Sequence, residues 1–298
     1  MIVTSFDEKR ENPVVICLGG FDSIHKGHKF LISVANDLKE NLDAKSVVFT
    51  YDNELCAING KSNGLVFTFE ERKIRLEKLG VDEICLAHFN YEFANRSPEE
   101  FLIKLCENRN VKMFICGKDF KFGKGAKGDF STLIKFCNEG KIAYKICDFI
   151  LDSEQKKFST STIKEKLSTG DIKKVNDYLG DNYFVLGRVI SGRKVGRQLG
   201  FPTANIAFST SKYLPKNGVY ATHVIIKGKR YNAITNVGNA PTFNEEKKLI
   251  ECHVDGFNGN LYDQDLIVYF DFYIRDICKF ESVDLLIRQL EKDLTVIR

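Results

Sequence analysis

The sequence predicts a two-domain α/β plus β protein, in which a parallel sheet wrapped by helices is followed by an antiparallel barrel. Its 298 residues are enough for two hydrophobic cores. From residue 13 to about 150, short apolar runs alternate with helical patterns, whereas from residue 184 strand-like runs follow one another through polar turns. We therefore expect a first domain over residues 1–165, a helical connector over 166–182 and a second domain over 183–298.

The first half contains five candidate strands. They are short apolar runs at Pro13–Leu18, Ser46–Tyr51, Glu83–Ala87, Val111–Cys116 and Ile142–Phe149. Apolar residues recur at helical spacing over Phe30–Leu38, which places His28 at the start of a helix. Ser97, followed three residues later by glutamate, indicates the start of another. Strand and helix in alternation predict a parallel sheet, which binds ligands at the carboxyl ends of its strands.

The second half has a different pattern. Two short helical segments, Ser161–Leu167 and Asp171–Leu179, indicate a connector. Five candidate strands follow, at Phe184–Ile190, Val219–Ile226, Tyr231–Val237, Glu251–Val254 and Leu266–Asp271. A last helix from Ser282 carries apolar residues on one face. We expect an antiparallel barrel with this helix packed on it.

Composition excludes several classes of function. With 44 Lys+Arg against 40 Asp+Glu and no long run of one sign, nothing points to a nucleic acid or a membrane surface as a partner. Met1–Glu8 lacks the pattern of a signal peptide and no later stretch is apolar enough to span a membrane, so we expect a cytoplasmic protein. The nine cysteines form no Cys-x-x-Cys pair, which favours buried thiols over disulfides or zinc ligands.

The segment Gly19–His28 has the pattern of a phosphate site after a strand. Gly27 allows the backbone to approach a phosphate, and the start of a helix supplies free N–H groups. His25 and His28 could donate hydrogen bonds to phosphates as charge develops during nucleotidyl transfer. In the alternative, one histidine caps the helix and the other is solvated. A zinc site is less favoured because no third histidine or cysteine lies nearby in the sequence.

A second phosphate pattern spans Gly187–Asn205. Its glycines and backbone amides can surround the phosphates of ATP, while Thr203 and Asn205 offer neutral oxygens to a bridging Mg²⁺. A rigid turn would explain Pro202 but not the remaining positions of the pattern.

The first half resembles the nucleotidylyltransferases, and specifically the Rossmann-like N-terminal domain of the bacterial bifunctional riboflavin kinase/FMN adenylyltransferases, also called FAD synthetases. The resemblance rests on Gly19–His28, on the basic glycine-rich loop Gly117–Asp129, and on the Ser/Thr-rich turn Phe158–Lys164. Two positions depart from the family pattern: Ser23 replaces a usual glycine, and Tyr51–Leu55 lacks a Pro-His-Pro segment. These departures concern the rate and the flavin affinity of the adenylyl step.

The second half resembles riboflavin kinases. The matching segments are Gly187–Asn205, Asn236–Phe243 and Glu251–Val254. Glu251 aligns with the catalytic glutamate of that family, which implies that it accepts the proton of the riboflavin 5′-hydroxyl; its alternation with Cys252 also permits a merely exposed strand residue. Arg275 lies in a region that closes over flavin in the family.

The resemblance implies an enzyme that phosphorylates riboflavin to FMN and then adenylylates FMN to FAD and pyrophosphate, with ATP as co-substrate in both steps and Mg²⁺ as cofactor. It implies catalytic residues His25, His28 and Glu251, with Thr203 and Asn205 as metal ligands. The implied ATP and phosphate contacts are Gly19, Phe21, Asp22, Gly27, Ser159, Thr160, Lys164, Gly192, Gly196, Gly200, Pro202, Thr203 and Asn205. The implied flavin contacts are Asp119, Phe120, Phe122, Gly123 and Arg275.

Two alternatives to this reading stay open. One is a riboflavin kinase whose adenylyltransferase activity is weak or lost, because the departures from the family pattern cluster in the first half. The other is an inert flavin-sensing scaffold. The sequence leaves the oligomeric state open, a homo-oligomer included.

Overall fold

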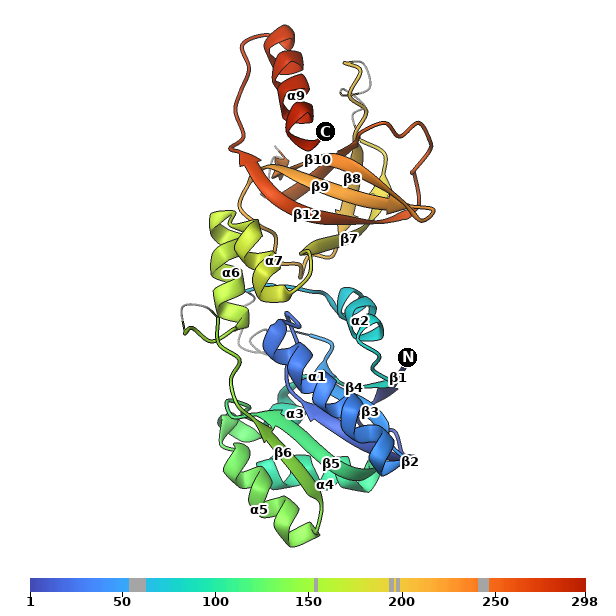
Figure 1. Ribbon diagram of the computed structural model, residues 1–298, viewed down its shortest axis with the longest axis vertical. Helices are drawn as coiled ribbons and strands as arrows, with labels where there is room; N and C mark the ends of the chain where they lie inside the picture. Colours follow the sequence, from blue (N-terminus) through green and yellow to red (C-terminus); the bar gives the residue numbers. More distant parts are fainter. Residues whose placement is uncertain (54–62, 153–154, 193–195, 197–198, 241–246) are drawn as a thin grey trace. The chain divides into compact units, whose positions relative to one another are not determined.

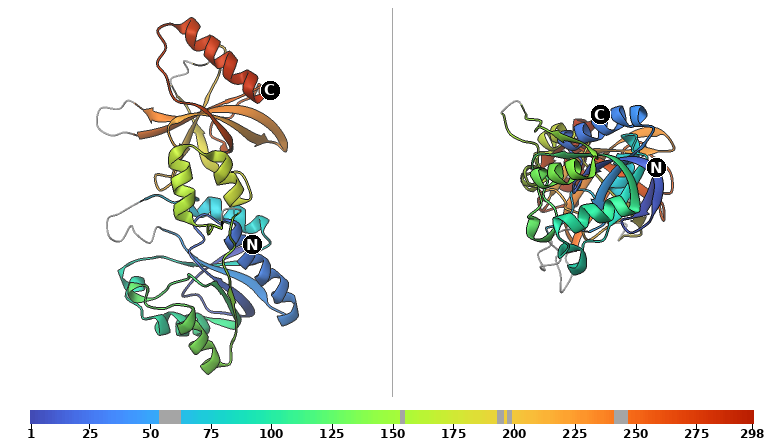
Figure 2. Two further views of the ribbon diagram at one scale, coloured as in Figure 1. Left: turned by 60° about the vertical axis from the view of Figure 1, so that its left-hand side comes forward. Right: turned by 90° about the horizontal axis from the view of Figure 1, so that it is seen from below.

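The computed structural model describes residues 1–53, 63–152, 155–192, 196, 199–240 and 247–298. The chain forms two compact units, Met1–Thr160 and Ser161–Arg298 (Figure 1, Figure 2). The first unit contains a six-stranded sheet and the second a closed six-stranded barrel. The predicted fold class is confirmed.

The first unit is built on a parallel sheet of order β1-β4-β3-β2-β5-β6. Its strands are β1 (Ile2–Ser5), β2 (Arg10–Leu18), β3 (Lys45–Tyr51), β4 (Glu83–Ala87), β5 (Arg109–Gly117) and β6 (Ala143–Cys147). The five predicted strands are present, while the edge strand β1 was not predicted from its four residues. Because all strands run in parallel, their carboxyl ends meet at one edge of the sheet, where the predicted first site lies.

Helices cover both faces of this sheet. They are α1 (Lys26–Lys39), α2 (Phe69–Lys78), α3 (Tyr91–Ala94), α4 (Pro98–Asn108) and α5 (Phe130–Gly140), with short 3₁₀ turns at Glu40–Leu42 and Lys124–Ala126. One core cluster joins Ile16 and Leu18 to Phe101 of α4. The other joins Cys17 to Leu76 of α2. Side chains of a strand alternate between faces, so β2 contributes to both cores.

Capping side chains set where these helices begin. Ser97 and Glu100 form the predicted capping box of α4. Thr68 and Glu71 form another at α2, a helix that was not predicted. His25 is the N-cap of α1, so the helix start expected near His28 is found.

The second unit is an antiparallel closed barrel of order β10-β11-β8-β7-β12-β9. It comprises α6 (Thr160–Thr169), α7 (Ile172–Leu179), β7 (Phe184–Ile190), β8 (Ala204–Phe208), β9 (Gly218–Ile226), β10 (Lys229–Ala240), β11 (Lys247–Val254), β12 (Asp265–Arg275) and α9 (Val283–Ile297). The strand β8, which directly follows the glycine-rich segment, was not predicted. A two-residue hairpin turn at Lys227 and Gly228 joins β9 to β10, with positive φ at both residues.

The helix α9 packs on the outer face of this barrel (Figure 1). Leu294 forms a small cluster with Val219 of β9 and Ile234 of β10, joined by Phe201 and Ile297. Contact with the barrel therefore buries one face of α9, as its apolar spacing predicted.

In the described part of the chain, no helix is long and apolar enough to cross a membrane. The eight described cysteines are free thiols, and all are at least partly buried except the exposed Cys278. Cys56 lies outside the described residues.

Candidate functional site

The first site begins at the loop between β2 and α1. Phe21 and Ile24 have left-handed backbone angles, with φ of 48° and 45°. This region is unfavourable for bulky residues and especially for β-branched ones, so the loop carries local strain. Such strain persists when surrounding contacts hold the backbone, and it is typical of functional loops.

Two buried arginines of α2 hold this loop. Arg72 donates from Nη1 to Thr50 Oγ1 (2.8 Å), and the Thr50 hydroxyl donates to the Gly20 carbonyl (2.7 Å). Arg75 donates from Nη2 to the Ile24 carbonyl (3.2 Å). Burial lowers the pKa of the Arg72 guanidinium. Neither arginine was predicted, because α2 itself was not recognised in the sequence.

The loop orients His25 and His28. The His28 backbone N–H donates to His25 Nδ1 (3.2 Å), so the neutral His25 ring carries its proton on Nε2. The two rings stack with centroids 3.8 Å apart and an angle of 13° between their planes. Burial lowers the pKa of His25 to about 4 and that of His28 well below its usual value. Both rings are therefore neutral hydrogen-bond donors near pH 7.

His28 has one feature of its own. Although the residue is partly exposed, its Nδ1 atom is buried and has no hydrogen-bond partner in the described structure. In native proteins a buried polar atom of this kind is usually satisfied by water or a ligand.

Both histidines border a cavity of about 240 Å³ at the carboxyl edge of the sheet. Its lining comprises Leu18, Gly19, Gly20, His25, Gly27, His28, Leu31, Tyr51, Gly117, Asp119, Phe120, Lys121, Asp148, Phe149, Ile150, Lys157 and Phe158. The structure thus brings together the predicted Gly19, Gly27, Asp119 and Phe120 with the histidines. A Cβ at Gly27 would lie 3.1 Å from the His25 ring, so a larger residue there would crowd that ring.

The cavity also contains a cation that the sequence reasoning missed. Lys157 forms an ion pair with Asp119, and its Nζ lies 4.5 Å from the centroid of the Phe149 ring. The cavity wall therefore combines two lysines, Lys121 and Lys157, with the aromatic rings of Phe120 and Phe158. Such a wall suits a planar ligand that carries phosphate.

Other residues predicted for this site lie behind the cavity. Phe21 and Phe122 are buried, and Phe122 stacks on Phe120 with centroids 5.4 Å apart. Asp22 accepts a hydrogen bond from the Val66 backbone N–H (2.8 Å). Gly123 has a φ of 70°, and a Cβ there would lie 2.6 Å from the Pro98 nitrogen.

The Ser/Thr turn before α6 contacts the loop at Ser23. The Ser23 and Thr160 hydroxyls are hydrogen-bonded at 2.9 Å. Ser23 does not have a positive φ, so the serine at this position needs no glycine-like backbone. Ser159 directly precedes this threonine, and Lys164 belongs to the second unit, where its Nζ lies 5.5 Å from the Tyr213 ring.

The second site begins with the glycine-rich segment between β7 and β8. A Cβ on Gly192 would lie 2.2 Å from Asn205 Nδ2, and one on Gly196 would lie 2.4 Å from the Phe201 carbonyl. Gly200 has a φ of 83°. Each glycine is thus required by a close approach or a left-handed backbone. Residues 193–195 and 197–198 of the predicted pattern lie outside the described residues.

Neighbouring strands bring the remaining kinase residues together. Glu251 of β11 is the direct register partner of Asn205 of β8. The next pair, Cys252 and Ala204, is buried inside the barrel, so Glu251 and Asn205 lie on the outer face. In the described structure the Glu251 carboxylate has no hydrogen bond or ion pair, which leaves it available to a substrate.

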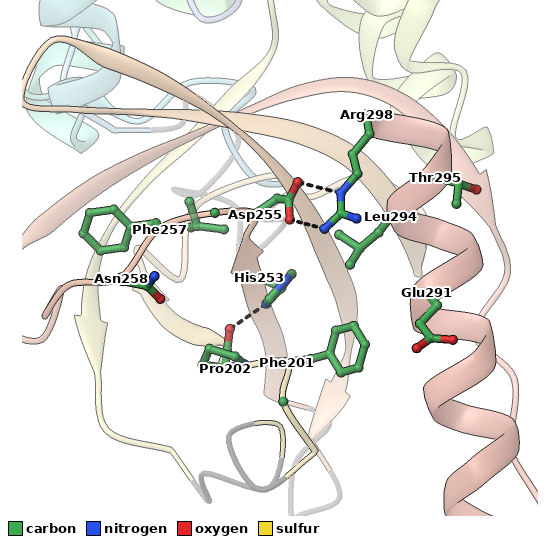
Figure 3. Close-up of a pocket in the computed structure, with 13 residues that line it drawn as sticks. Phe201, Pro202, His253, Asp255, Phe257, Asn258, Glu291, Leu294, Thr295 and Arg298 are labelled. Carbon is green, nitrogen blue, oxygen red and sulfur yellow. Dashed lines mark hydrogen bonds and ion pairs between the residues drawn. The ribbon is translucent and has the colours of Figure 1, made fainter.

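Two cavities adjoin Pro202. The first, of about 640 Å³, is lined by Gly192, Pro202, Thr203, Asn205 and residues of the segment 257–262. The second, of about 550 Å³, lies beside α9 (Figure 3). The first contains both predicted metal ligands and the second contains neither, so the first is the candidate nucleotide cavity.

Figure 3 shows two contacts between residues that line the second cavity. The His253 ring nitrogen Nδ1 is 2.8 Å from the Pro202 carbonyl, and Arg298 pairs with Asp255 (Nη2 to Oδ1, 2.8 Å). These contacts join β11 to the glycine-rich segment and to the end of α9.

Arg275, predicted to contact flavin, holds α9 in this structure. Its Nη2 lies 2.7 Å from Oδ2 of Asp293, a buried residue of α9. Its Nη1 donates to the Asp276 carbonyl (3.1 Å). A flavin contact by Arg275 stays a prediction.

These observations define a two-site phosphotransfer enzyme, with neutral histidines at a helix start in one unit and a glycine-rich loop beside a free carboxylate in the other. The chain belongs to the bifunctional riboflavin kinase/FMN adenylyltransferase family. The FAD synthetase family model matches residues 7–162 and the riboflavin kinase model matches residues 179–298.

Relatives of the same description cover nearly the whole chain. The bifunctional riboflavin kinase/FMN adenylyltransferase of Bacillus subtilis is 33% identical and that of Haemophilus influenzae 32%; the matches cover 94% of this chain and 90% and 91% of theirs. A crystal structure from Streptococcus pneumoniae, described as a macrolide-efflux protein, superimposes with a TM-score of 0.91 and 30% identity. That match covers 100% of this chain and 99% of the other.

Proposed function

We propose that this chain makes FAD from riboflavin in two ATP-dependent steps. The second unit phosphorylates the riboflavin 5′-hydroxyl to give FMN and ADP. The first unit transfers AMP from another ATP to FMN, giving FAD and pyrophosphate. The observation that carries the proposal is the register of Glu251 with Asn205, which sets a free carboxylate beside the glycine-rich phosphate loop in a chain of this family.

In the kinase step, Glu251 accepts the proton of the 5′-hydroxyl as the hydroxyl oxygen attacks the γ-phosphorus of ATP. The bond from that phosphorus to the bridging oxygen breaks, and ADP leaves. Backbone groups near Gly192 and Gly196 surround the phosphates. Their lack of side chains allows this close approach.

The residues present fit Mg²⁺. Thr203 and Asn205 both line the nucleotide cavity and offer neutral oxygens, which Mg²⁺ accepts together with phosphate oxygens and water. Within the described residues, no cluster of three or more His, Cys, Asp or Glu is placed to hold a metal by itself. When bound, Mg²⁺ would neutralise charge on the transferred phosphate.

In the adenylyl step, an FMN phosphate oxygen attacks the α-phosphorus of ATP and pyrophosphate leaves. His25 Nε2–H donates to the phosphates as negative charge develops, and His28 acts beside it. Both rings are neutral, so the proton on each ring stays in place through the step. Phe120 and Lys157 border the cavity that would hold the flavin.

We place the functional boundaries at residues 1–165, 166–182 and 183–298, with the connector helices serving the second unit. Asn176 of α7 supports this, because its amide donates to the Phe270 carbonyl of β12 (2.8 Å).

Dependence on ATP supports a cytoplasmic location. The near balance of charge supports small molecules as partners, namely riboflavin, FMN, FAD, ATP, ADP and pyrophosphate.

One assay tests the proposal against its alternatives. The purified chain is incubated with Mg-ATP and either riboflavin or FMN, and the flavin products are separated. FAD from both substrates supports two active sites. FMN from riboflavin without FAD indicates a kinase that has lost its second activity, and no product from either substrate indicates a flavin-binding scaffold.

A further inference from the structure

We propose that Asn236 hydrogen-bonds a ribityl hydroxyl of riboflavin and thereby sets the 5′-hydroxyl against Glu251. The proposal rests on the kinase function proposed above. It assigns a substrate contact to a strand residue of β10 that lies on the opposite side of Glu251 from the phosphate loop.

The barrel register places Asn236 beside the base. Asn236 is the direct partner of Glu251 in the β10–β11 pair, as Asn205 is in the β8–β11 pair. On its other side Asn236 faces Val219, which in turn faces Arg275. These residues form one row across the outer face of the barrel, in the order Asn205, Glu251, Asn236, Val219 and Arg275.

The order of residues in this row indicates on which side of Glu251 each substrate binds. Asn205 lines the nucleotide cavity, so the phosphates lie on that side of Glu251. The acceptor substrate must approach Glu251 from another direction, because its hydroxyl attacks the phosphorus in line with the leaving oxygen. Asn236 lies on the side of Glu251 away from Asn205.

The Asn236 amide lacks a partner. Its Oδ1 is buried and makes no hydrogen bond in the described structure. The adjacent buried residue Thr235, by contrast, is satisfied inside the barrel by the Thr222 hydroxyl at 2.8 Å. Leaving a buried acceptor unpaired is costly, and an unpaired group of this kind calls for an explanation such as a ligand donor.

Gly238 keeps side-chain atoms away from the Asn236 amide. Gly238 follows on the same face of β10, and a Cβ there would lie 3.8 and 3.9 Å from Asn236 Nδ2 and Oδ1. The same Cβ would lie 3.1 Å from Ile277 Cδ1, so a side chain at this buried position would crowd Ile277 beside the amide.

The spacing also fits the substrate. Directly opposed side chains in an antiparallel pair have Cβ atoms about 4.5–5.5 Å apart. A ribityl chain carries hydroxyls on successive carbons, so it can present its 5′-hydroxyl to Glu251 and the 4′- or 3′-hydroxyl to Asn236. A hydroxyl donates a hydrogen bond, which the unpaired Oδ1 requires.

The test combines a variant with altered substrates in the full chain. Asn236→Ala should lower kcat/KM for riboflavin by ~10-fold, the effect of one lost buried hydrogen bond, with KM for ATP unchanged. The parent should lose a similar factor on analogues that lack either the 4′- or the 3′-hydroxyl. For the variant, kcat/KM on one of those analogues should be less than ~2-fold below its kcat/KM on riboflavin. The reason is that the variant already lacks the contact to the hydroxyl that this analogue is missing.

Asn232→Ala is the matched control. Asn232 lies on the same strand and donates to the Ile297 carbonyl of α9 (2.6 Å), so its loss affects packing but not hydroxyl discrimination. Asn236→Ser is a second variant in case the alanine variant does not fold. It should discriminate between riboflavin and the two analogues less strongly than the parent does. A folded Asn236 variant that discriminates against both analogues as strongly as the parent overturns the proposal. A parent that does not phosphorylate riboflavin instead refutes the kinase function.

Discussion

Glu251 and Asn205 face each other across the β8–β11 pair, on the outer side of the barrel. Their Cβ atoms are therefore within the ~4.5–5.5 Å typical of directly opposed residues. The proposed metal ligand and the proposed base thus belong to one strand pair. A base held in this strand pair would need no separate movement to meet a phosphate bound by the loop before β8.

Glu251→Gln tests the proton-accepting role. The amide keeps the size of the side chain but cannot take the proton, so FMN production should fall by ~10²–10⁴-fold. ATP binding and adenylylation of supplied FMN should persist, as measured by product separation. Glu281→Gln, at an exposed position of the same unit, is the control and should match the parent. An unchanged rate of FMN production in Glu251→Gln would show that Glu251 is a strand residue without a chemical role.

Thr203→Ala and Asn205→Ala should fail for a different reason. Each removes an oxygen that would contact Mg²⁺, so the Mg-ATP complex should bind more weakly. Raising Mg²⁺ should partly restore FMN production in these two variants but not in Glu251→Gln. Identical Mg²⁺ responses in all three variants would show that the separate roles are wrong.

How far the sequence predicted this site depended on whether a residue lay in a local motif. Gly192 and Thr203 belong to one continuous pattern, and their position follows from it. The partnership of Asn205 with Glu251 depends on strand register, which is fixed by the whole barrel, and the strand β8 was not recognised at all. Arg72 was missed for the same reason, because it acts from a helix remote in sequence.

His28→Ala should separate the two activities. The variant should suppress FAD formation from FMN by ~10²–10³-fold, the usual effect of removing a preorganised donor to developing charge. Riboflavin phosphorylation should stay near the parent rate, because His28 lies in the other compact unit. Equal loss of both activities would point to global destabilisation, which a melting curve detects. No loss of either would leave His28 without the proposed role.

The buried His25 should make the first unit sensitive to acid. Its pKa is about 4 in the folded protein because of burial, against about 6.5 when unfolded. Between these values the unfolded chain binds a proton that the folded chain does not, so the stabilisation is complete above pH 6.5 and is lost as pH falls toward 4. The full difference is roughly 3 kcal/mol.

His25→Asn isolates this effect. Asparagine supplies a side-chain oxygen that can accept the His28 N–H in place of His25 Nδ1, and it does not titrate in this range. Denaturant unfolding at pH 7 and pH 4.5 should show a larger loss of stability in the parent than in His25→Asn. Equal losses would mean that His25 is protonated in the folded state.

Arg72→Met should impair the adenylyl step through the loop. The variant loses the hydrogen bonds to Thr50 and to the Tyr51 carbonyl, which leaves their oxygens less well satisfied. We expect FAD formation to fall by ~10-fold and the first unit to lose ~1–3 kcal/mol of stability. Lys73→Met, whose lysine pairs with Glu70 near the surface, is the control. Normal FAD formation in a destabilised Arg72→Met would limit Arg72 to a structural role.

Two fragments test where the kinase unit begins. Asn182–Arg298 contains the complete barrel and α9, so it should convert riboflavin to FMN with Mg-ATP when expressed alone. Ser161–Arg298 adds α7, which buries Val175 and Leu179, and a buried aliphatic side chain contributes ~1.5–3 kcal/mol. The longer fragment should therefore melt at a higher temperature with the same activity. A folded shorter fragment without kinase activity would show that the boundary or the assigned site is wrong. Equal melting temperatures would show that α7 adds nothing to the stability of the barrel.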